Sequence, residues 1–454
     1  MNVILLPFLS SLAAHAVSAV AASDDAIIAI VGNAWIASTG TPCAQLAAMV
    51  NGANISGLDV AATGIEIADS SCFMPIDIAY VNDMRALDGV VVEQDTNVSV
   101  SPEKPDVFGV QSGGDDVVPS GIAPDASAAP RTWGLDRIDQ STLPLDNLPF
   151  SAAPKGTGAV VYIIDTGVYA AHADFGGRAR SAADFIYEKP IGDNHGHGTH
   201  TSATAIGATL GVARGATVKA IKVLSRTGSG TISSVIRGIE WAVRDARLLR
   251  RAGVLSMSLG GGFSTALNQA CIAAGTAGNI VVVAAGNSAN DACYSSPASA
   301  GGNALKTGVV TVAASTTADQ FAFFSNTGRC VDIAAPGLNI LSASITSRTS
   351  TRTMSGTSMS APHVSGVLAI LLEKNGFNRT KALNELLLIA RKGALTGAPS
   401  VTPNLLLQTP GARSKGADVP SQTPSSSPPS MPSSCSAALA DLMIIAIMFF
   451  PIFF

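Results

Sequence analysis

The 454-residue sequence predicts an α/β fold with an open parallel sheet and helices on both of its faces. The main observation is a set of five runs rich in β-branched residues, at 160–164, 218–224, 254–258, 280–284 and 309–313. Continuous apolar runs are typical of parallel strands that are covered on both faces. A second observation is the segment 232–249, whose apolar residues recur at helical spacing. Strands that alternate with helices place a functional site at the carboxyl ends of the strands.

Length and composition limit the possible functions. By the usual size of domains, the 454 residues allow two or three of them. Charged residues make up 13% of the chain and the net charge is −4, so the basic excess of a nucleic-acid-binding protein is missing. We therefore expect no nucleic-acid partner.

The two ends of the chain resemble targeting segments. Residues 1–22 contain an apolar stretch that ends in small residues, which predicts a secretory signal peptide; a buried N-terminal helix is the alternative. Residues 442–454 are apolar throughout but are fewer than the roughly 20 that a spanning helix needs. Small residues precede them, so residues 437–454 fit either a GPI-type signal or a retained tail anchor.

Four segments lie between these ends. Residues 23–102 predict a small α+β domain, with strands at 26–31 and 90–95. Residues 103–130 are rich in Gly, Pro, Ser, Ala and Asp without periodicity, which indicates an exposed linker. Residues 131–395 contain the alternating strands and helices. Residues 396–436 lack this pattern and predict a Pro- and Ser-rich stalk.

The segment 356–364, GTSMSAPHV, places three hydroxyl groups before an apolar run. Proline fits a helix best in its first turn, so Pro362 predicts a helix from about Ser358 to Lys374. Ser358 would then lie among unpaired backbone N–H groups at the positive end of the helix, where an oxyanion is stabilised. Taken alone, an ordinary N-cap serine is the simpler interpretation.

Two further motifs strengthen the catalytic interpretation. An apolar strand ends in Asp165, within IDTG at 164–167, and HGTH follows at 197–200. These motifs and GTSMSAP at 356–362 resemble the three catalytic blocks of the subtilisin-like serine proteases (the subtilase family, peptidase family S8), and in particular the proteinase K-like branch. The resemblance covers residues 133–391. It implies the subtilisin-like α/β fold, with the order Asp, His, Ser along the chain.

The resemblance assigns the catalytic roles. Ser358 is the expected nucleophile, His197 the base and then the acid, and Asp165 the group that orients His197. Asn287, in AAGN at 284–287, matches the side chain that completes the oxyanion hole. His195 is expected at the rim of the site and His200 in a structural role. A zinc site is the alternative for the three histidines, but their glycines break the helix that such a motif requires.

Glycine-rich segments are expected to bind the substrate. In the family, two edges pair with an extended peptide, and they correspond here to Gly228, Ser229 and Gly230 on one side and Ser258, Leu259 and Gly260 on the other. Main-chain pairing gives affinity with little sequence preference. Residues 258–261, 284–286 and 294–297 contain no Asp or Glu, so we expect apolar or aromatic P1 residues and broad specificity.

The cysteines and Asp332 suggest structural features. Cys293 and Cys330 fall where related enzymes have a disulfide, which leaves Cys271 as a buried thiol. Cys43 and Cys72 could pair in the N-terminal domain, but the sequence does not determine their connectivity. Asp332 matches a calcium ligand of the proteinase K-like branch, although the loop that accompanies it is longer here. No cofactor is expected for the chemistry, and structural calcium is possible.

Together these observations predict a secreted or surface-anchored serine endopeptidase that is made as a zymogen. Its partners would be polypeptide substrates, the membrane through the C-terminal segment, and its own N-terminal domain as an inhibitory propeptide that is cut off within the linker. We expect a monomer. Two alternatives remain: an inactive surface adhesin on the same scaffold, and a maturation protease dedicated to one partner.

Overall fold

The computed structural model describes residues 35–39, 41–60, 64–67, 71–76, 78–100, 132–397 and 399–414. Five expectations therefore lie wholly or largely outside the described residues. They are the signal peptide, the strand at 26–31, the linker at 103–130, most of the stalk and the apolar segment at 437–454.

In its described residues, the N-terminal domain combines an antiparallel sheet with helices, as the α+β prediction required. Its strand order is β2-β3-β1-β4, formed by Ile65–Ile67, Ser71–Ile76, Trp35–Thr39 and Val91–Gln94. Helix α1 (Cys43–Gly52), a short 3-10 turn (Ile78–Tyr80) and α3 (Val81–Arg85) connect them. A disulfide joins Cys43 to Cys72, with 4.7 Å between their Cα atoms, and settles the pairing that the sequence left open. Small domains commonly need such a crosslink because their cores are small.

The catalytic region is built on a nine-stranded sheet with the order β18-β19-β15-β14-β12-β10-β6-β8-β7. All neighbouring strands are parallel except β18 and β19. The five strands predicted from the β-branched runs are confirmed as its centre. In sheet order the strands are Arg391–Lys392, Leu405–Leu406, Ile333–Pro336, Val309–Ser315, Ile280–Ala284, Val254–Met257, Val160–Asp165, Thr217–Lys222 and Ala179–Asp184.

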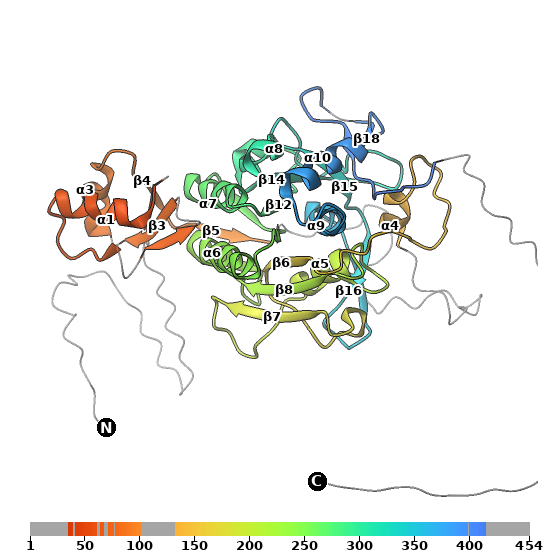
Figure 1. Ribbon diagram of the computed structural model, residues 1–454, viewed down its shortest axis with the longest axis horizontal. Helices are drawn as coiled ribbons and strands as arrows, with labels where there is room; N and C mark the ends of the chain where they lie inside the picture. The colour runs from red at the N-terminus through yellow and green to blue at the C-terminus, as the bar shows by residue number, and fades with distance from the viewer. Residues whose placement is uncertain are drawn as a thin grey trace, which may run out of the picture. The chain divides into compact units, whose positions relative to one another are not determined.

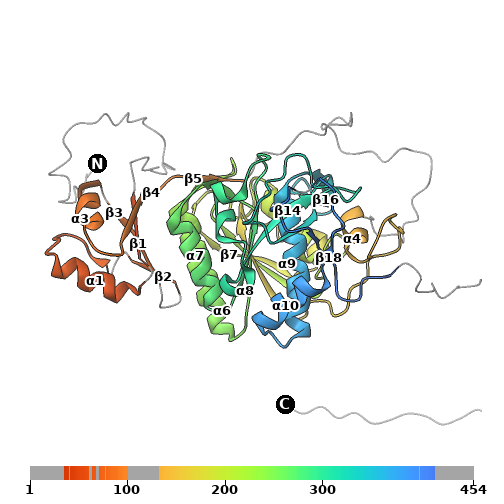
Figure 2. The same cartoon turned by 90° about the horizontal axis from the view of Figure 1, so that it is seen from above.

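Helices cover both faces of this sheet (Figures 1 and 2). Helices α6 (Ile232–Leu249) and α7 (Thr265–Thr276) pack on one face, against alternate strand residues such as Tyr162 and Ile164. Helices α5 (His197–Ile206), α9 (Thr357–Lys374) and α10 (Arg379–Ile389) pack on the other, against Val161 and Ile163. Both sides of the central strands are therefore buried, which explains why their sequences are apolar without alternation.

Shorter elements complete the region. Helix α4 (Trp133–Ile138) begins it, and α8 (Ala304–Thr307) precedes β14. The hairpin β16–β17 (Ile340–Ala343 and Thr351–Met354) precedes α9. Single 3-10 turns are formed by Ala173–Phe175, Ala292–Tyr294 and Ala298–Ala300.

The boundary predicted between residues 395 and 396 is wrong, because the chain beyond it returns to the sheet. Strand β19 pairs with both β15 and β18. The guanidinium of Arg413 then binds two carboxylates near the start of the region, Asp139 at 2.8 Å and Asp146 at 2.9 Å. Residues 399–414 therefore belong to the catalytic region, and a stalk can begin only after them.

The predicted disulfide is present in the structure. Cys293 and Cys330 are bonded, with 5.4 Å between their Cα atoms, well within the roughly 7 Å limit for such a bridge. Cys271 is a free thiol on the buried side of α7, and burial raises its pKa well above the usual value. It is therefore an unreactive packing residue.

Candidate active site

Asp165 and His197 form a hydrogen-bonded pair. Asp165 is the last residue of β6, at the carboxyl edge of the sheet, and His197 is the first residue of α5. His197 Nδ1 lies 2.8 Å and 2.9 Å from the two carboxylate oxygens, and both side chains are buried. The carboxylate therefore fixes Nδ1 as the protonated nitrogen and leaves Nε2 as the basic one.

A second carboxylate, Asp193, holds this pair in place. It accepts hydrogen bonds from the Thr166 hydroxyl at 2.9 Å and from the Thr199 hydroxyl at 2.6 Å. It also accepts from the backbone N–H groups of His195, Gly196 and Thr199. Burial alone would raise the pKa of Asp193, but these hydrogen bonds outweigh it and hold the pKa below its usual value. The Asp193 anion thus ties the residue after Asp165 to the first turn of α5.

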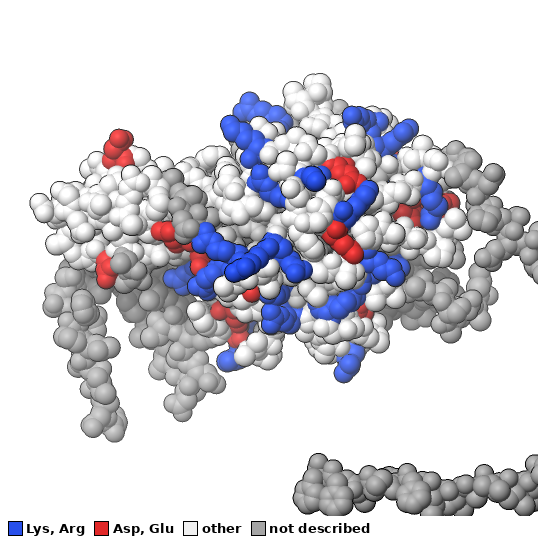
Figure 3. Space-filling model, in the orientation of Figure 1, with Lys and Arg blue, Asp and Glu red and all other residues white. Residues whose placement is uncertain are grey.

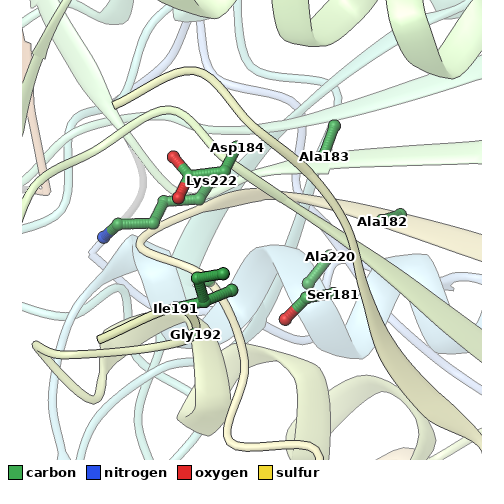
Figure 4. Close-up of a pocket in the computed structure, with 9 residues that line it drawn as sticks. Ser181, Ala182, Ala183, Asp184, Ile191, Gly192, Ala220 and Lys222 are labelled. Carbon is green, nitrogen blue, oxygen red and sulfur yellow. The ribbon is translucent and has the colours of Figure 1, made fainter. Parts of the chain in front are cut away.

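Lys222 supports the same loop from the other side. Its Nζ donates to the carbonyl of Thr166 at 2.9 Å and to that of Leu224 at 2.7 Å. Figure 4 shows Lys222 next to Asp184 beside a small cavity behind this loop, lined also by Ser181, Ile191 and Gly192. The cavity is separate from the cleft described below. The ammonium group of Lys222 holds the backbone of this loop in place through its two hydrogen bonds to carbonyls.

Ser358 lies in the buried first turn of α9, as the sequence predicted. Pro362, however, lies in the second turn, contrary to the expectation that it would be confined to the first. Proline cannot donate to the carbonyl of Ser358, four residues earlier. The Ser258 hydroxyl donates to that carbonyl instead, at 2.8 Å, while the Ser358 hydroxyl donates to the carbonyl of Ser258 at 3.2 Å. Two bonds therefore join the start of α9 to the end of β10.

Asn287 faces the same turn of α9, and Thr357 determines its orientation. The Asn287 Oδ1 atom accepts from the backbone N–H of Thr357 at 2.9 Å and from its hydroxyl at 2.8 Å. The NH₂ group must then point the other way. It is buried and has no hydrogen-bond partner among the described residues. A Cβ atom built on Gly356 would lie 2.9 Å from this nitrogen and 3.6 Å from the Ser358 N–H, so both donors face one small space.

The predicted substrate-binding segments form the two sides of a cleft, and a strand of the N-terminal domain lies between them. The sheet order is β13-β11-β5-β9, formed by Ser295–Ser296, Gly260–Gly262, Asn97–Ser99 and Ser229–Thr231. Strand β5 is antiparallel to both neighbours, and Val100 N donates to the carbonyl of Gly228 at 2.9 Å. Gly228 has φ +72°, and a Cβ there would meet the Val100 side chain at 2.7 Å. The cleft therefore accepts an extended chain in the way that a substrate would bind.

A pocket opens beside this strand and contains no charged side chain. It is lined by Leu259, Gly260, Gly261, residues 284–288, Ser295, Ser296, Ala298, Asn326 and Ser99 of the N-terminal domain. Asn326 shapes it, because its side chain accepts from the N–H groups of Ser288 and Asn290 and donates to the carbonyl of Ala285. Gly286 has φ +104° and lies so close to Asn326 that a Cβ would clash at 2.4 Å.

Two carboxylates of the N-terminal domain cap helices of the catalytic region. Glu93 accepts from the Ser264 hydroxyl and from the Thr265 N–H, the latter at 2.9 Å, at the start of α7. Asp95 accepts from the Ser233 N–H at 2.9 Å and from its hydroxyl at 2.6 Å, at the start of α6. Negative charge at a helix N-terminus is favourable, so these contacts hold the domain that delivers β5 to the cleft.

His195 and His200, the histidines nearest to His197 in the sequence, have different surroundings. His200 Nε2 lies 3.0 Å from the carbonyls of both Ile340 and Arg352, and burial lowers its pKa to about 3. It is therefore neutral and structural, as expected. The ring of His195 lies beside that of His197, with 6.2 Å between centroids, and borders Gly228 at the cleft. Among the described residues, no three His, Cys, Asp or Glu side chains are arranged to hold a metal.

Asp332 does not fit the calcium site that the resemblance implied. Its carboxylate accepts from the backbone N–H groups of Gly302 at 3.0 Å, Ala304 at 3.2 Å and Thr311 at 2.9 Å. Both oxygens are thus used to organise the loop before β14. Calcium needs six to eight oxygen ligands, whereas N–H donors surround this carboxylate.

Asp193, Thr357 and Asn326 are the residues that sequence reasoning missed. Asp193 lies four residues before His197, and Thr357 directly precedes Ser358. An acidic and a hydroxyl side chain this close in the sequence to candidate catalytic residues are a signal from which both could have been predicted. Asn326 is 39 positions from Asn287, and nothing in the local sequence indicates that they share a loop.

Comparisons with known proteins agree with this geometry. A family model described as the subtilase family matches residues 156–399. An extracellular serine proteinase from a Thermus species is 45% identical over 289 residues, or 63% of this chain and 68% of the relative. The subtilisin-like serine protease Pen c 2 from Penicillium citrinum is 42% identical, over 64% of this chain and 67% of the relative. The crystal structure of a cold-adapted subtilisin-like serine proteinase is similar, with a TM-score of 0.57, 41% identity and coverage of 61% of this chain and 98% of that one.

We predict that Asp193→Asn lowers kcat/KM by roughly one to two orders of magnitude, because several charge-assisted hydrogen bonds are weakened at once. The acidic limb of the pH profile should move to lower pH, since a buried negative charge that favours the imidazolium of His197 is gone. Steady-state rates across pH provide the measurement.

The matched control is Asp174→Asn. Asp174 is also buried and accepts from the N–H and hydroxyl of Thr209, at 2.8 Å and 2.7 Å, away from the cleft. It should lose stability without moving the pH profile. If both variants leave the profile where it was, Asp193 is only a structural residue.

Proposed function

Because the chain belongs to the subtilase family of serine peptidases, we propose that it cleaves peptide bonds through an acyl-enzyme formed on Ser358. In this proposal His197 is the general base and acid, Asp165 orients it, and Asn287 stabilises the oxyanion. The observation that best supports this proposal is the buried NH₂ group of Asn287, which has no hydrogen-bond partner among the described residues and faces the same small space as the Ser358 N–H. An unpaired buried donor costs roughly 1–3 kcal/mol, which is tolerated where a transition state supplies the acceptor.

The geometry supports the following sequence of steps. The Ser358 hydroxyl leaves the carbonyl of Ser258 and gives its proton to Nε2 of His197 as its oxygen attacks the scissile carbonyl. The oxyanion receives hydrogen bonds from the Ser358 N–H and the Asn287 amide. His197 then protonates the leaving amine, and water hydrolyses the acyl-enzyme by the same route. None of these steps requires a cofactor.

The substrates that we propose are extended polypeptides with apolar or aromatic P1 residues and otherwise broad sequences. Support comes from the cleft, where β9 and β11 offer main-chain partners, and from the adjoining pocket, which has no charged side chain. The N-terminal domain would act as the chain's own inhibitor, since β5 takes the place of a substrate strand. We propose that the enzyme is a monomer.

We also propose that the protein acts outside the cell, attached to the surface by its C-terminal segment. The extracellular relative and the apolar sequence at 437–454 support this location. In the part of the chain that the structure describes, no helix has both the length and the apolar character to cross a membrane.

A fluorophosphonate probe tests the nucleophile. It should label the wild type at Ser358 and fail to label Ser358→Ala, whose turnover should fall by about 10⁶. Ser360→Ala is the matched control, because its buried hydroxyl, in the same turn of α9, only donates to the carbonyl of Ala335 at 3.0 Å. That variant should be labelled normally.

The same variant tests self-processing. Ser358→Ala should keep residues 35–100 covalently attached, whereas the wild type and Ser360→Ala should release them by a cut between residues 103 and 131. Normal trimming of Ser358→Ala in a host without other subtilases would make a separate protease the activator. Labelling of Ser358→Ala at another residue would contradict the proposed nucleophile, and a wild type that the probe does not label would favour the inactive adhesin.

Specificity is tested by kcat/KM on a set of peptides that differ only at P1. Phe and Leu should exceed Lys and Asp by at least an order of magnitude, because an uncharged pocket offers no partner to a buried charge. Unrelated denatured proteins should also be degraded. A preference for Lys or Arg, or cleavage of one protein alone, would contradict the proposal and favour a dedicated maturation role.

A further inference from the structure

The charges of this chain are divided unevenly between its parts. Residues 132–414 contain 24 Lys and Arg and 15 Asp and Glu, a net charge of +9. Residues 23–131 contain 3 Lys and Arg and 15 Asp and Glu, a net charge of −12. The net charge of −4 for the whole chain therefore combines a strongly cationic catalytic region with an acidic N-terminal part.

Part of this positive charge lies on the side away from the cleft. Helices α6 and α9 both begin at the cleft, after β9 and at Ser358, and each has 18 residues. At 1.5 Å per residue, they end about 27 Å away, at the opposite edge of the sheet. Figure 2 shows α6, α7 and α10 along this direction. Cations are favoured at helix C-termini, and α6 ends in an arginine-rich segment.

Contacts between these helix ends gather the cations into one surface. Arg251 donates to the carbonyl of Gly158 at 2.9 Å and lies 4.8 Å from the ring centroid of Phe377, just after α9. Arg379, at the start of α10, donates to the carbonyl of Gly275 near the end of α7. We call this surface the basic face; its members are Arg244, Arg247, Arg250, Arg251, Arg379 and Lys381. Figure 3 shows Lys and Arg gathered over α6.

Acidic groups near this surface bind cations or backbone N–H groups. Asp245 binds Lys219, and the carboxylate of Glu373 accepts from the N–H of Thr157 at 2.7 Å. Glu240 binds Arg244 at 3.4 Å, and Glu385 binds Lys374 at 2.5 Å. Arg244, Arg247, Arg250 and Lys381 are exposed. The basic face thus exposes guanidinium and ammonium groups to solvent, where an external partner can reach them.

Two exposed leucines lie among these arginines. Leu248 is 77% exposed and Leu249 is 40% exposed, at the end of α6 between Arg247 and Arg250. Apolar side chains flanked by cations are typical of surfaces that bind the headgroup region of a bilayer. A purely hydrophilic polyanion would gain no binding free energy from these two leucines.

We propose that the basic face docks on an anionic phospholipid surface, with Arg244, Arg247, Arg250 and Lys381 at the phosphate level and Leu248 inserted among the lipids. The cleft then points away from the membrane, toward proteins in solution. The separation of about 27 Å exceeds the Debye length of about 8–10 Å, so the lipid charge leaves the catalytic groups undisturbed.

Vesicle co-sedimentation tests this proposal on the full chain. Wild-type protein should bind vesicles of phosphatidylcholine with 30% phosphatidylserine much more tightly than phosphatidylcholine alone. The apolar segment at 437–454 contributes equally to both, so the difference isolates the charge effect. A variant with Arg244→Gln, Arg247→Gln, Arg250→Gln and Lys381→Gln should lose this preference for phosphatidylserine. Each removed charge should weaken binding to these vesicles by about fivefold. High salt should abolish it in the wild type.

The matched control replaces four cations outside the basic face, with Lys189→Gln, Arg226→Gln, Arg348→Gln and Arg352→Gln. It should keep most of the preference for phosphatidylserine vesicles. Leu248→Ala should weaken vesicle binding several-fold but leave binding to heparin unchanged. The basic-face variant should still cleave a soluble peptide, which verifies its fold. Equal vesicle binding by the wild type and the basic-face variant would overturn the proposal. Arginine-dependent binding to heparin alone would overturn it in favour of a soluble polyanion.

Discussion

The structure depends on how the N-terminus of α9 is held inside the protein. All residues from Thr357 to Leu372 are buried, so the first turn has no access to water for its unpaired backbone groups. The partners come from two neighbouring strands. Ser258, after β10, satisfies the Ser358 carbonyl that Pro362 leaves without a donor, and Asn287, after β12, accepts from Thr357. The nucleophile is thus fixed by the carboxyl ends of two central strands.

The other two members of the candidate triad, Asp165 and His197, are positioned by a different set of bonds, which converge on Thr166. Its hydroxyl donates to Asp193 and accepts from the Gly198 N–H at 2.9 Å, while its carbonyl accepts from Lys222. These bonds lock the end of β6 to the start of α5, and α5 packs against α9. The sheet therefore serves as a rigid frame in which two helix N-termini and one strand end meet at a single edge, as polar catalysis requires.

Sequence reasoning was most successful where local signals were strong. The β-branched runs located the central strands, and GTSMSAP located the start of α9 within one residue. It was less successful where the fold combines distant segments. The return of β19 to the sheet depends on pairing with β15, some 70 residues earlier, and a Pro- and Ser-containing sequence gives little sign of it. Asp332 was assigned to calcium by resemblance, but three backbone N–H groups surround its carboxylate, two from the loop at 299–308 and one from Thr311 in β14.

The central claim is that Thr357 holds the Asn287 amide in position for the oxyanion at the start of α9. A double-mutant cycle on kcat tests it most directly. Thr357→Val should lower kcat by about tenfold, the cost of roughly one hydrogen bond, and Asn287→Ala by about 10²–10³. If Thr357 acts through Asn287, the double variant should be no slower than Asn287→Ala alone. Losses that multiply would show that the two residues act independently, and would contradict this account of the site.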